Sequence, residues 1–194
     1  MTRSTSPAQL TVADVAAWRA WLERNEHTSD GVWLVLAKKG TTVPTSLSYA
    51  EALREALCSG WIDGRRNAVD DATYRQHFTP RRTRSLWSQR NVDLVGGLIE
   101  SGRMRERGLQ EVSRAQADGR WDRAYAGPAT IEVPADLQTA LASSPSAASA
   151  FRALDRTSRY PILLHIATAP NDMARAARIT RQVDRLATSV TPGA

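Results

Sequence analysis

The chain has 194 residues, of which 42% are hydrophobic and 24% are charged, a composition typical of soluble globular domains. No apolar run approaches the roughly 20 residues that span a bilayer, and the first residues lack the apolar middle of a signal peptide. We therefore expect a cytoplasmic protein without a membrane partner. One cysteine, Cys58, and three histidines far apart in the sequence do not match any usual metal-binding spacing, so we expect no metal and no cofactor.

The net charge of +6 leaves an anionic partner such as nucleic acid open, and the distribution of this charge matters more than its sum. Nearly all the basic residues are arginine, which a genome rich in G and C encodes readily, and a solvated surface accounts for most of them. Several arginines nevertheless lie close together in the sequence: Arg65, Arg66, Arg75, Arg81, Arg82, Arg84 and Arg90. These arginines could form a basic surface patch that binds an anion.

The chain begins with a small, polar stretch, residues 1–10, which we predict to be disordered. Thr11, with Asp14 in the third position after it, is predicted to cap a helix that ends near Arg24. The stretch "VWLVLAKKG" that follows is a short, continuous apolar run closed by glycine. It predicts a buried strand within residues 31–38.

The next helix has the clearest boundaries in the chain. Ser48 and Glu51 form a capping-box pair at its start, and Gly60 suits its C-terminal end. After Gly60, the stretches "WIDGRRNAVD" and "TYRQHFTPR" predict two strands around a turn near Asp70 and Asp71. Together with the first strand, they predict a three-stranded antiparallel sheet.

Two further helices are predicted after this sheet. The first, at about 85–101, carries an apolar stripe in which Asn91 is the exception. An unpaired amide on such a stripe costs about 1–3 kcal/mol. We therefore expect Asn91 to face inward and to form a hydrogen bond either with a ligand or with the neighbourhood of Asp63 and Arg81. The second helix, at about 106–118, ends at Gly119.

The last third of the chain is predicted to be helical after a linker at 126–133, which contains glycine and proline. Three prolines suit the first turns of short helices: Pro134, Pro145 and Pro161. Asn171 is expected to cap the last helix. The predicted organisation is an α+β core domain at 11–125, in which helices cover the small sheet, then a helical subdomain at 134–188 and a disordered tail at 189–194.

Polar and aromatic side chains lie near the ends of these predicted elements, where pockets commonly form. The chain has no nucleophile elbow, no Walker loop and no dinucleotide-binding glycine motif, and Cys58 is expected to be a buried structural thiol. The candidate catalytic residues are Tyr49, Asp63 and Asn91, and the candidate ligand-binding residues are Trp33, Lys38, Trp61, Arg81, Ser85 and Trp87.

The order of "SYAEALREALCSGWIDG", "FTPRRTRSLWSQRN", "SGRM" and "GRWDRAY" resembles the YdeI/OmpD-associated family, which is named in part for bacteriocin protection. The resemblance runs from about residue 12 to residue 187. The C-terminal helices resemble the family's OmdA segment, which ends approximately in W-I-x-x-A-K-x-x-x-T-R-x-x-R-I. The chain keeps Ile166, Ala169, Arg175, Arg178 and Ile179 of this pattern. It departs from the pattern at His165, Pro170 and Ala174. The resemblance implies a cytosolic bacterial protein linked to tolerance of toxic peptides or compounds.

The motif "GWIDG" allows two interpretations. Alternation along a strand points Trp61 and Asp63 to the same side of the sheet. In the first interpretation, Trp61 and Trp87 fill the core while Asp63 forms a structural ion pair with Arg65, Arg81 or Arg82. In the second, both tryptophans wall a pocket in which Asp63, Arg81 and Asn91 hold a polar ligand.

Three functions from different classes follow. The first is a binding module that sequesters or senses a toxic small molecule or peptide through aromatic walls and an Asp/Arg pair. The second is a metal-independent hydrolase in which Asp63 is the general base and Tyr49 and Asn91 orient the substrate. The third is a nucleic-acid-binding or regulatory protein that uses the arginines, which the absence of a helix-turn-helix or an aromatic RNA-binding signature makes the least favoured.

Overall fold

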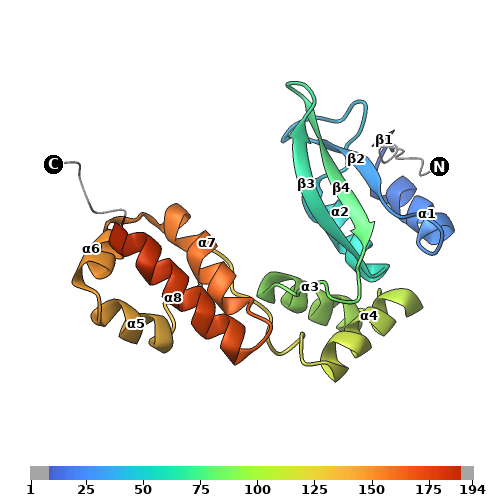
Figure 1. Cartoon of the computed structure of the whole chain (residues 1–194). Helices are drawn as coiled ribbons and strands as arrows, with labels where there is room; N and C mark the ends of the chain where they lie inside the picture. The colour runs from blue at the N-terminus through green and yellow to red at the C-terminus, as the bar shows by residue number, and fades with distance from the viewer. Residues whose placement is uncertain (1–8, 189–194) are drawn as a thin grey trace, which may run out of the picture. The chain divides into compact units, whose positions relative to one another are not determined.

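A computed structural model describes residues 9–188 of the chain (Figure 1), and the predicted disorder of residues 1–8 and 189–194 lies outside the described residues. The chain divides into two compact units. The N-terminal unit contains residues 9–85 and 91–123, and the C-terminal unit contains residues 86–90 and 124–188. Sheet and helices together confirm the expected α+β class.

The sheet has four strands, in the order β1-β2-β4-β3. They are β1 (Gln9–Leu10), β2 (Val32–Ala37), β3 (Trp61–Ala68) and β4 (Thr73–Pro80). The three long strands are antiparallel as predicted, but β1 pairs with β2 in parallel, so the prediction of a three-stranded antiparallel sheet was wrong. Strand β1 has only two residues, too few for alternation to reveal, and it lies in the stretch that we predicted to be disordered.

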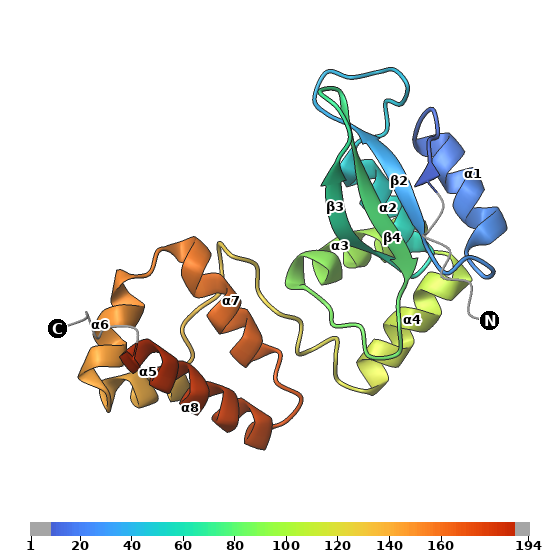
Figure 2. The same cartoon turned by 45° about the horizontal axis from the view of Figure 1, so that its top comes forward.

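Two helices lie before and after β2 in the chain, α1 (Val15–Asn25) and α2 (Tyr49–Cys58). The cap of α1 is Asp14, whose side chain accepts a hydrogen bond from the Ala17 amide, and not Thr11 as predicted. The predicted Ser48/Glu51 capping box of α2 is confirmed. Helix α2 lies against one face of the sheet (Figures 1 and 2).

The face of the sheet that meets the helices forms the core of the N-terminal unit. Trp18 of α1 is fully buried, and its ring lies 5.7 Å from that of Phe78 in β4. The Trp18 indole also donates a hydrogen bond to the Ala52 carbonyl in α2, which joins the two helices. Burial of these large rings supplies much of the hydrophobic stabilisation of the unit.

The N-terminal unit also contains most of α3 (Gln89–Glu100) and all of α4 (Glu106–Ala117). Helix α4 matches its prediction closely, whereas α3 begins four residues later than predicted. Ser85 and Trp87 therefore precede the helix. The backbone at Trp87 instead pairs with the residue before the predicted linker, because its carbonyl accepts a hydrogen bond of 3.0 Å from the Tyr125 amide.

The C-terminal unit contains four helices: α5 (Ala135–Ala142), α6 (Pro145–Ala153), α7 (Arg156–Ala167) and α8 (Asp172–Thr188). Asn171 caps α8 as predicted, since its side chain accepts a hydrogen bond from the Ala174 amide. Pro161 lies inside α7 rather than in the first turn of a helix. Ile131 and Val133 of the predicted linker pack against the helices and so belong to the unit. The core consists of Leu137, Leu141, Ala147, Phe151, Leu163, Ile166, Ile179 and Leu186.

Candidate functional site

The predicted pair of Tyr49 and Asp63 lies together in the structure. The Tyr49 hydroxyl donates a hydrogen bond of 2.9 Å to Asp63 Oδ2, and both residues are half-buried. Because Asp63 pairs with Phe78 across the sheet, its side chain shares the helix-covered face, and Tyr49 reaches it from the first turn of α2.

The expected ion pair of Asp63 is not formed. Within residues 9–188, no ion pair links its carboxylate to Arg65, Arg81 or Arg82. A β-bulge follows Asp63 and places Arg66 opposite Gln76, where its guanidinium lies 4.0 Å from the centre of the Tyr74 ring. Among the residues predicted to act together with Asp63, Tyr49 forms a hydrogen bond with its carboxylate in the structure.

Trp61 belongs to the core of the N-terminal unit. It is 0% exposed, its ring meets the Trp21 ring edge-on at 5.8 Å, and its indole nitrogen lies 3.4 Å from the Glu26 carbonyl oxygen. These contacts fill the face that the second interpretation assigned to a pocket. The structure thus gives Trp61 a packing role, in agreement with the first interpretation of "GWIDG".

Three other candidate residues are buried. Asn91 faces inward as expected, and Arg81 is buried at the end of β4, where its amide donates to the Gly60 carbonyl. Since Arg81 is buried, it cannot contribute to a basic surface patch. Trp87 is also buried, and it belongs to the C-terminal unit. Ser85 completes a local turn by accepting a hydrogen bond from the Arg82 amide.

Trp33 and Lys38 lie away from the Tyr49/Asp63 pair. Trp33 is on the opposite face of the sheet, where its ring lies 4.9 Å from that of His77 and 5.0 Å from the Arg75 guanidinium carbon. Lys38 donates to the Asp70 carbonyl at the hairpin between β3 and β4. Trp33 and Lys38 therefore do not share a site with Tyr49 and Asp63.

A buried carboxylate that was not among the predicted residues is Glu55 of α2, which is 1% exposed. Arg19 of α1 binds it through two hydrogen bonds of 2.9 and 3.0 Å, Arg103 donates a third, and an Arg105 nitrogen lies 3.8 Å away. Burial alone would raise the pKa of Glu55, but the hydrogen bond from Arg19 and the nearby arginine charges outweigh it and lower the pKa.

A second buried carboxylate, Glu26, adjoins this cluster. It accepts hydrogen bonds from the Ser59 hydroxyl and from Arg105 Nε, the latter at 3.2 Å. Arg105 also donates to the Ser59 hydroxyl and to the Glu55 carbonyl. The acids of this cluster are already bound to arginines. Within the described part of the chain, the cluster therefore stabilises the packing of the helices and offers no free carboxylate to a ligand. One sequence signal was available, since Glu55 lies at helical spacing from Ala52 and Cys58 on the apolar side of α2.

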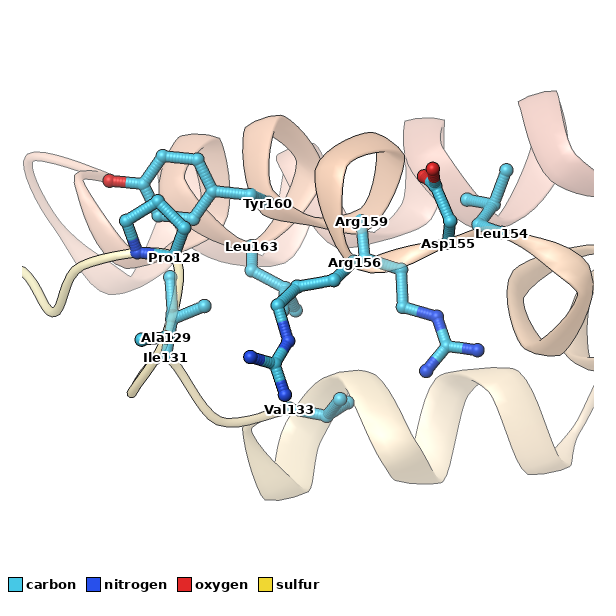
Figure 3. Close-up of a pocket in the computed structure, with 10 residues that line it drawn as sticks. All are labelled: Pro128, Ala129, Ile131, Val133, Leu154, Asp155, Arg156, Arg159, Tyr160 and Leu163. Atoms are coloured by element: carbon cyan, nitrogen blue, oxygen red, sulfur yellow. The ribbon is translucent and has the colours of Figure 1, made fainter.

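The structure contains a cavity of about 430 Å³ in the C-terminal unit (Figure 3). Its walls come from the linker and from α7 with the two residues before it, and they are lined by Pro128, Ala129, Ile131, Val133, Leu154, Asp155, Arg156, Arg159, Tyr160 and Leu163. Such a mixture of apolar walls and a few charged groups is typical of ligand pockets. We call it the linker pocket.

Two arginines give the linker pocket its charge. The Arg156 and Arg159 guanidinium groups extend from α7 toward α5, whereas the Asp155 carboxylate points away from them (Figure 3). Asp155 caps α7 and accepts a hydrogen bond of 2.7 Å from the Ser158 amide; its hydrogen bonds with Ser158 lower its pKa. The Asp155 charge is thus engaged at the helix terminus, and the pocket is basic.

These features describe a two-unit α+β protein with a basic, partly apolar pocket in a helical unit. The chain belongs to the family "Domain of unknown function (DUF8412)", whose model matches residues 10–111. Residues 130–188 match a second family, OmdA, described as "Bacteriocin-protection, YdeI or OmpD-Associated". The predicted resemblance is therefore confirmed for the C-terminal unit, and the N-terminal motifs fall mainly within the other match. No curated protein and no solved structure matches the chain.

The arginines that the chain shares with the OmdA pattern have structural contacts. Arg175 of α8 binds both carboxylate oxygens of Asp136 in α5 and donates to the Ile166 carbonyl at the end of α7. Arg178 donates to the neighbouring carbonyl of His165. Both side chains thus add hydrogen bonds to carbonyls in the last turn of α7.

We expect Arg175→Ala to lower the free energy of unfolding of the C-terminal unit by about 1.5–3 kcal/mol, because it removes charge-assisted hydrogen bonds to α5 and α7. Urea denaturation followed by circular dichroism measures this change. The control is Arg181→Ala, which removes an exposed arginine from the same helix and should change the stability by less than about 0.5 kcal/mol. Equal stability of the two variants would contradict this role of Arg175.

Proposed function

We propose that this protein is a cytoplasmic binding protein with a role related to bacteriocin protection, and that it binds a toxic peptide or small molecule in the linker pocket. The match of residues 130–188 to the bacteriocin-protection family supports the role, and the pocket lies largely within that segment. In residues 9–188, no helix is long and apolar enough to cross a membrane.

The linker pocket carries this proposal because it has the volume of a ligand pocket and both apolar and positively charged walls. Ile131, Val133 and Leu163 supply apolar walls, and the two arginines supply positive charge at one side. By contrast, the tryptophan-walled pocket expected around Trp61 is filled by the core. The proposed function is therefore still ligand binding, as predicted, but the proposed site lies in the C-terminal unit and not in the N-terminal unit.

The proposal is tested in bacteria that are sensitive to bacteriocins and produce the protein. We expect production to raise survival under at least one bacteriocin of a panel, and Ala129→Trp to abolish the gain, because an indole at this exposed wall fills the pocket. Ala153→Trp, at an exposed position outside the pocket, is the control and should keep the gain. Survival is normalised to soluble protein. Full survival with Ala129→Trp would rule the pocket out.

The hydrogen bond between Tyr49 and Asp63 favours a second candidate function, a metal-independent hydrolase with Asp63 as general base. Within residues 9–188, no three histidine, cysteine or acidic side chains are grouped so that they could hold a metal ion. Both residues of the pair are half-buried, Tyr49 at the start of α2 and Asp63 in β3. Asn91 would orient the substrate in this candidate function.

Asp63→Asn distinguishes this second function from a packing role. Since an amide oxygen can still accept the Tyr49 hydroxyl, and no arginine loses an ion pair, we expect a stability change of less than about 1 kcal/mol. If Asp63 is a base, loss of toxin should stop in lysates that contain the variant, as measured by mass spectrometry of the toxin. Unchanged toxin in lysates with the unsubstituted protein would exclude the hydrolase.

A further inference from the structure

A second cavity, of about 390 Å³, adjoins the linker pocket on the C-terminal unit. It is lined by Val133, Gln138, Leu141, Ala142, Ala148, Phe151, Arg152 and Arg159. Val133 and Arg159 line both cavities, so the two are neighbours with these side chains between them. We call this second cavity the helix pocket.

We propose that the two pockets form one groove that binds an extended peptide with an acidic side chain between two apolar ones. This inference rests on the proposed binding function and specifies its ligand. One apolar side chain would occupy the linker pocket and the other the helix pocket. The carboxylate would lie against Arg159, which lines both pockets, and against Arg156 of the linker pocket.

The charge at the junction favours an acidic group. Arg159 is held in place there, because its Nε and Nη2 donate to the Phe151 and Arg152 carbonyls at the end of α6. Arg156 is exposed, and within residues 9–188 its guanidinium has no hydrogen bond or ion pair. It is therefore available for a two-pronged contact with a carboxylate, which the planar guanidinium group favours.

The apolar walls on both sides of the junction favour an extended chain over a compact ligand. Leu154 and Leu163 lie in the linker pocket, whereas Leu141 and Phe151 lie in the helix pocket. In an extended peptide, residues i, i+2 and i+4 point to the same side. Each of them is about 6.6 Å from the next one in this series. The expected pattern is thus apolar, any residue, acidic, any residue, apolar.

The test uses the full chain and a fluorescein-labelled decapeptide with the central sequence Leu-Ser-Asp-Ser-Leu, followed by fluorescence anisotropy. We expect this peptide to bind at least about tenfold more tightly than versions with asparagine for the aspartate or alanine for both leucines. Arg156→Gln should reduce the difference between the affinities of the aspartate and asparagine peptides, because Arg159 alone is then left to meet the carboxylate. The matched charge control, Arg181→Gln, should leave the difference unchanged.

Equal binding of the aspartate and asparagine peptides to the unsubstituted protein would overturn the inference, as would binding of neither. Because these comparisons vary the peptide, they do not depend on the folding of a variant. The survival assay separates this inference from the proposed function. Protection that Ala129→Trp abolishes, without selective peptide binding, leaves the function standing and removes the acidic peptide as its ligand.

Discussion

Replacement of Glu55 by glutamine is expected to lower the free energy of unfolding of the N-terminal unit by about 3–5 kcal/mol. The substitution removes the charge that Arg19, Arg103 and Arg105 share, and breaking a buried ion pair from one side leaves its partners uncompensated. Glu51→Gln is the control on the same helix, because glutamine also serves in a capping box, and it should cost less than about 1 kcal/mol. Urea denaturation of both variants measures the difference.

The same carboxylate predicts how stability depends on pH. The pKa of Glu55 is lower in the folded chain than its ordinary value, so its contribution is complete above that ordinary value and is lost as the pH falls through the folded-state pKa. Acidification below about pH 4 should therefore destabilise the unsubstituted chain more than Glu55→Gln. An equal loss in both chains would show that Glu55 does not contribute in this way.

The second large effect is expected for Gly108→Ala in α4. A methyl group at Gly108 would overlap the Cys58 carbonyl at the end of α2, where backbone and not a flexible side chain limits the space. One of the two helices would have to move, and we expect a loss of about 3 kcal/mol or more. Gly96→Ala in α3 is the control, since nothing lies within 4 Å of its added methyl group.

The control substitution should change the stability in the opposite direction. Alanine is favoured over glycine inside a helix by about 0.5–1 kcal/mol, so Gly96→Ala should stabilise the chain slightly. Thermal unfolding of the two variants gives both values. If Gly108→Ala is as stable as Gly96→Ala, then α4 does not approach α2 as closely as the structure shows.

Local signals in the sequence were enough to predict much of the fold. Ser48 and Glu51 at α2 and Asn171 at α8 were assigned correctly, because capping needs only residues within one turn. Strand β1 was missed because its two residues pair with β2 and carry no pattern of their own. Pro161 was misplaced because a proline inside a helix resembles a helix start in the sequence alone.

The candidate site was harder to predict, since it depends on contacts between distant segments. The sequence placed Tyr49 and Asp63 in one group, and they do meet. It could not show that Trp21, forty residues earlier in the chain, covers Trp61 and closes the expected pocket. For the same reason, the sequence did not reveal the contact between Glu55 and Arg103, which lie 48 residues apart.

The linker pocket was out of reach for a related reason. Its wall at 128–133 lies in a stretch that the sequence indicated to be a linker, because glycine and proline interrupt every periodic pattern there. Only the packing of Ile131 and Val133 against the helices makes this stretch a wall of the linker pocket. A pocket between a loop and a helix has no sequence periodicity to reveal it.

The central claim, that the linker pocket is the ligand site, is tested most directly by hydrogen exchange with mass spectrometry. The full chain is compared with and without a bacteriocin against which it protects cells. Binding should slow the exchange of amides in residues 128–133 and 154–163, and Ala129→Trp should abolish this protection. Protection confined to residues 49–63, around Tyr49 and Asp63, would contradict the claim and place the site in the N-terminal unit.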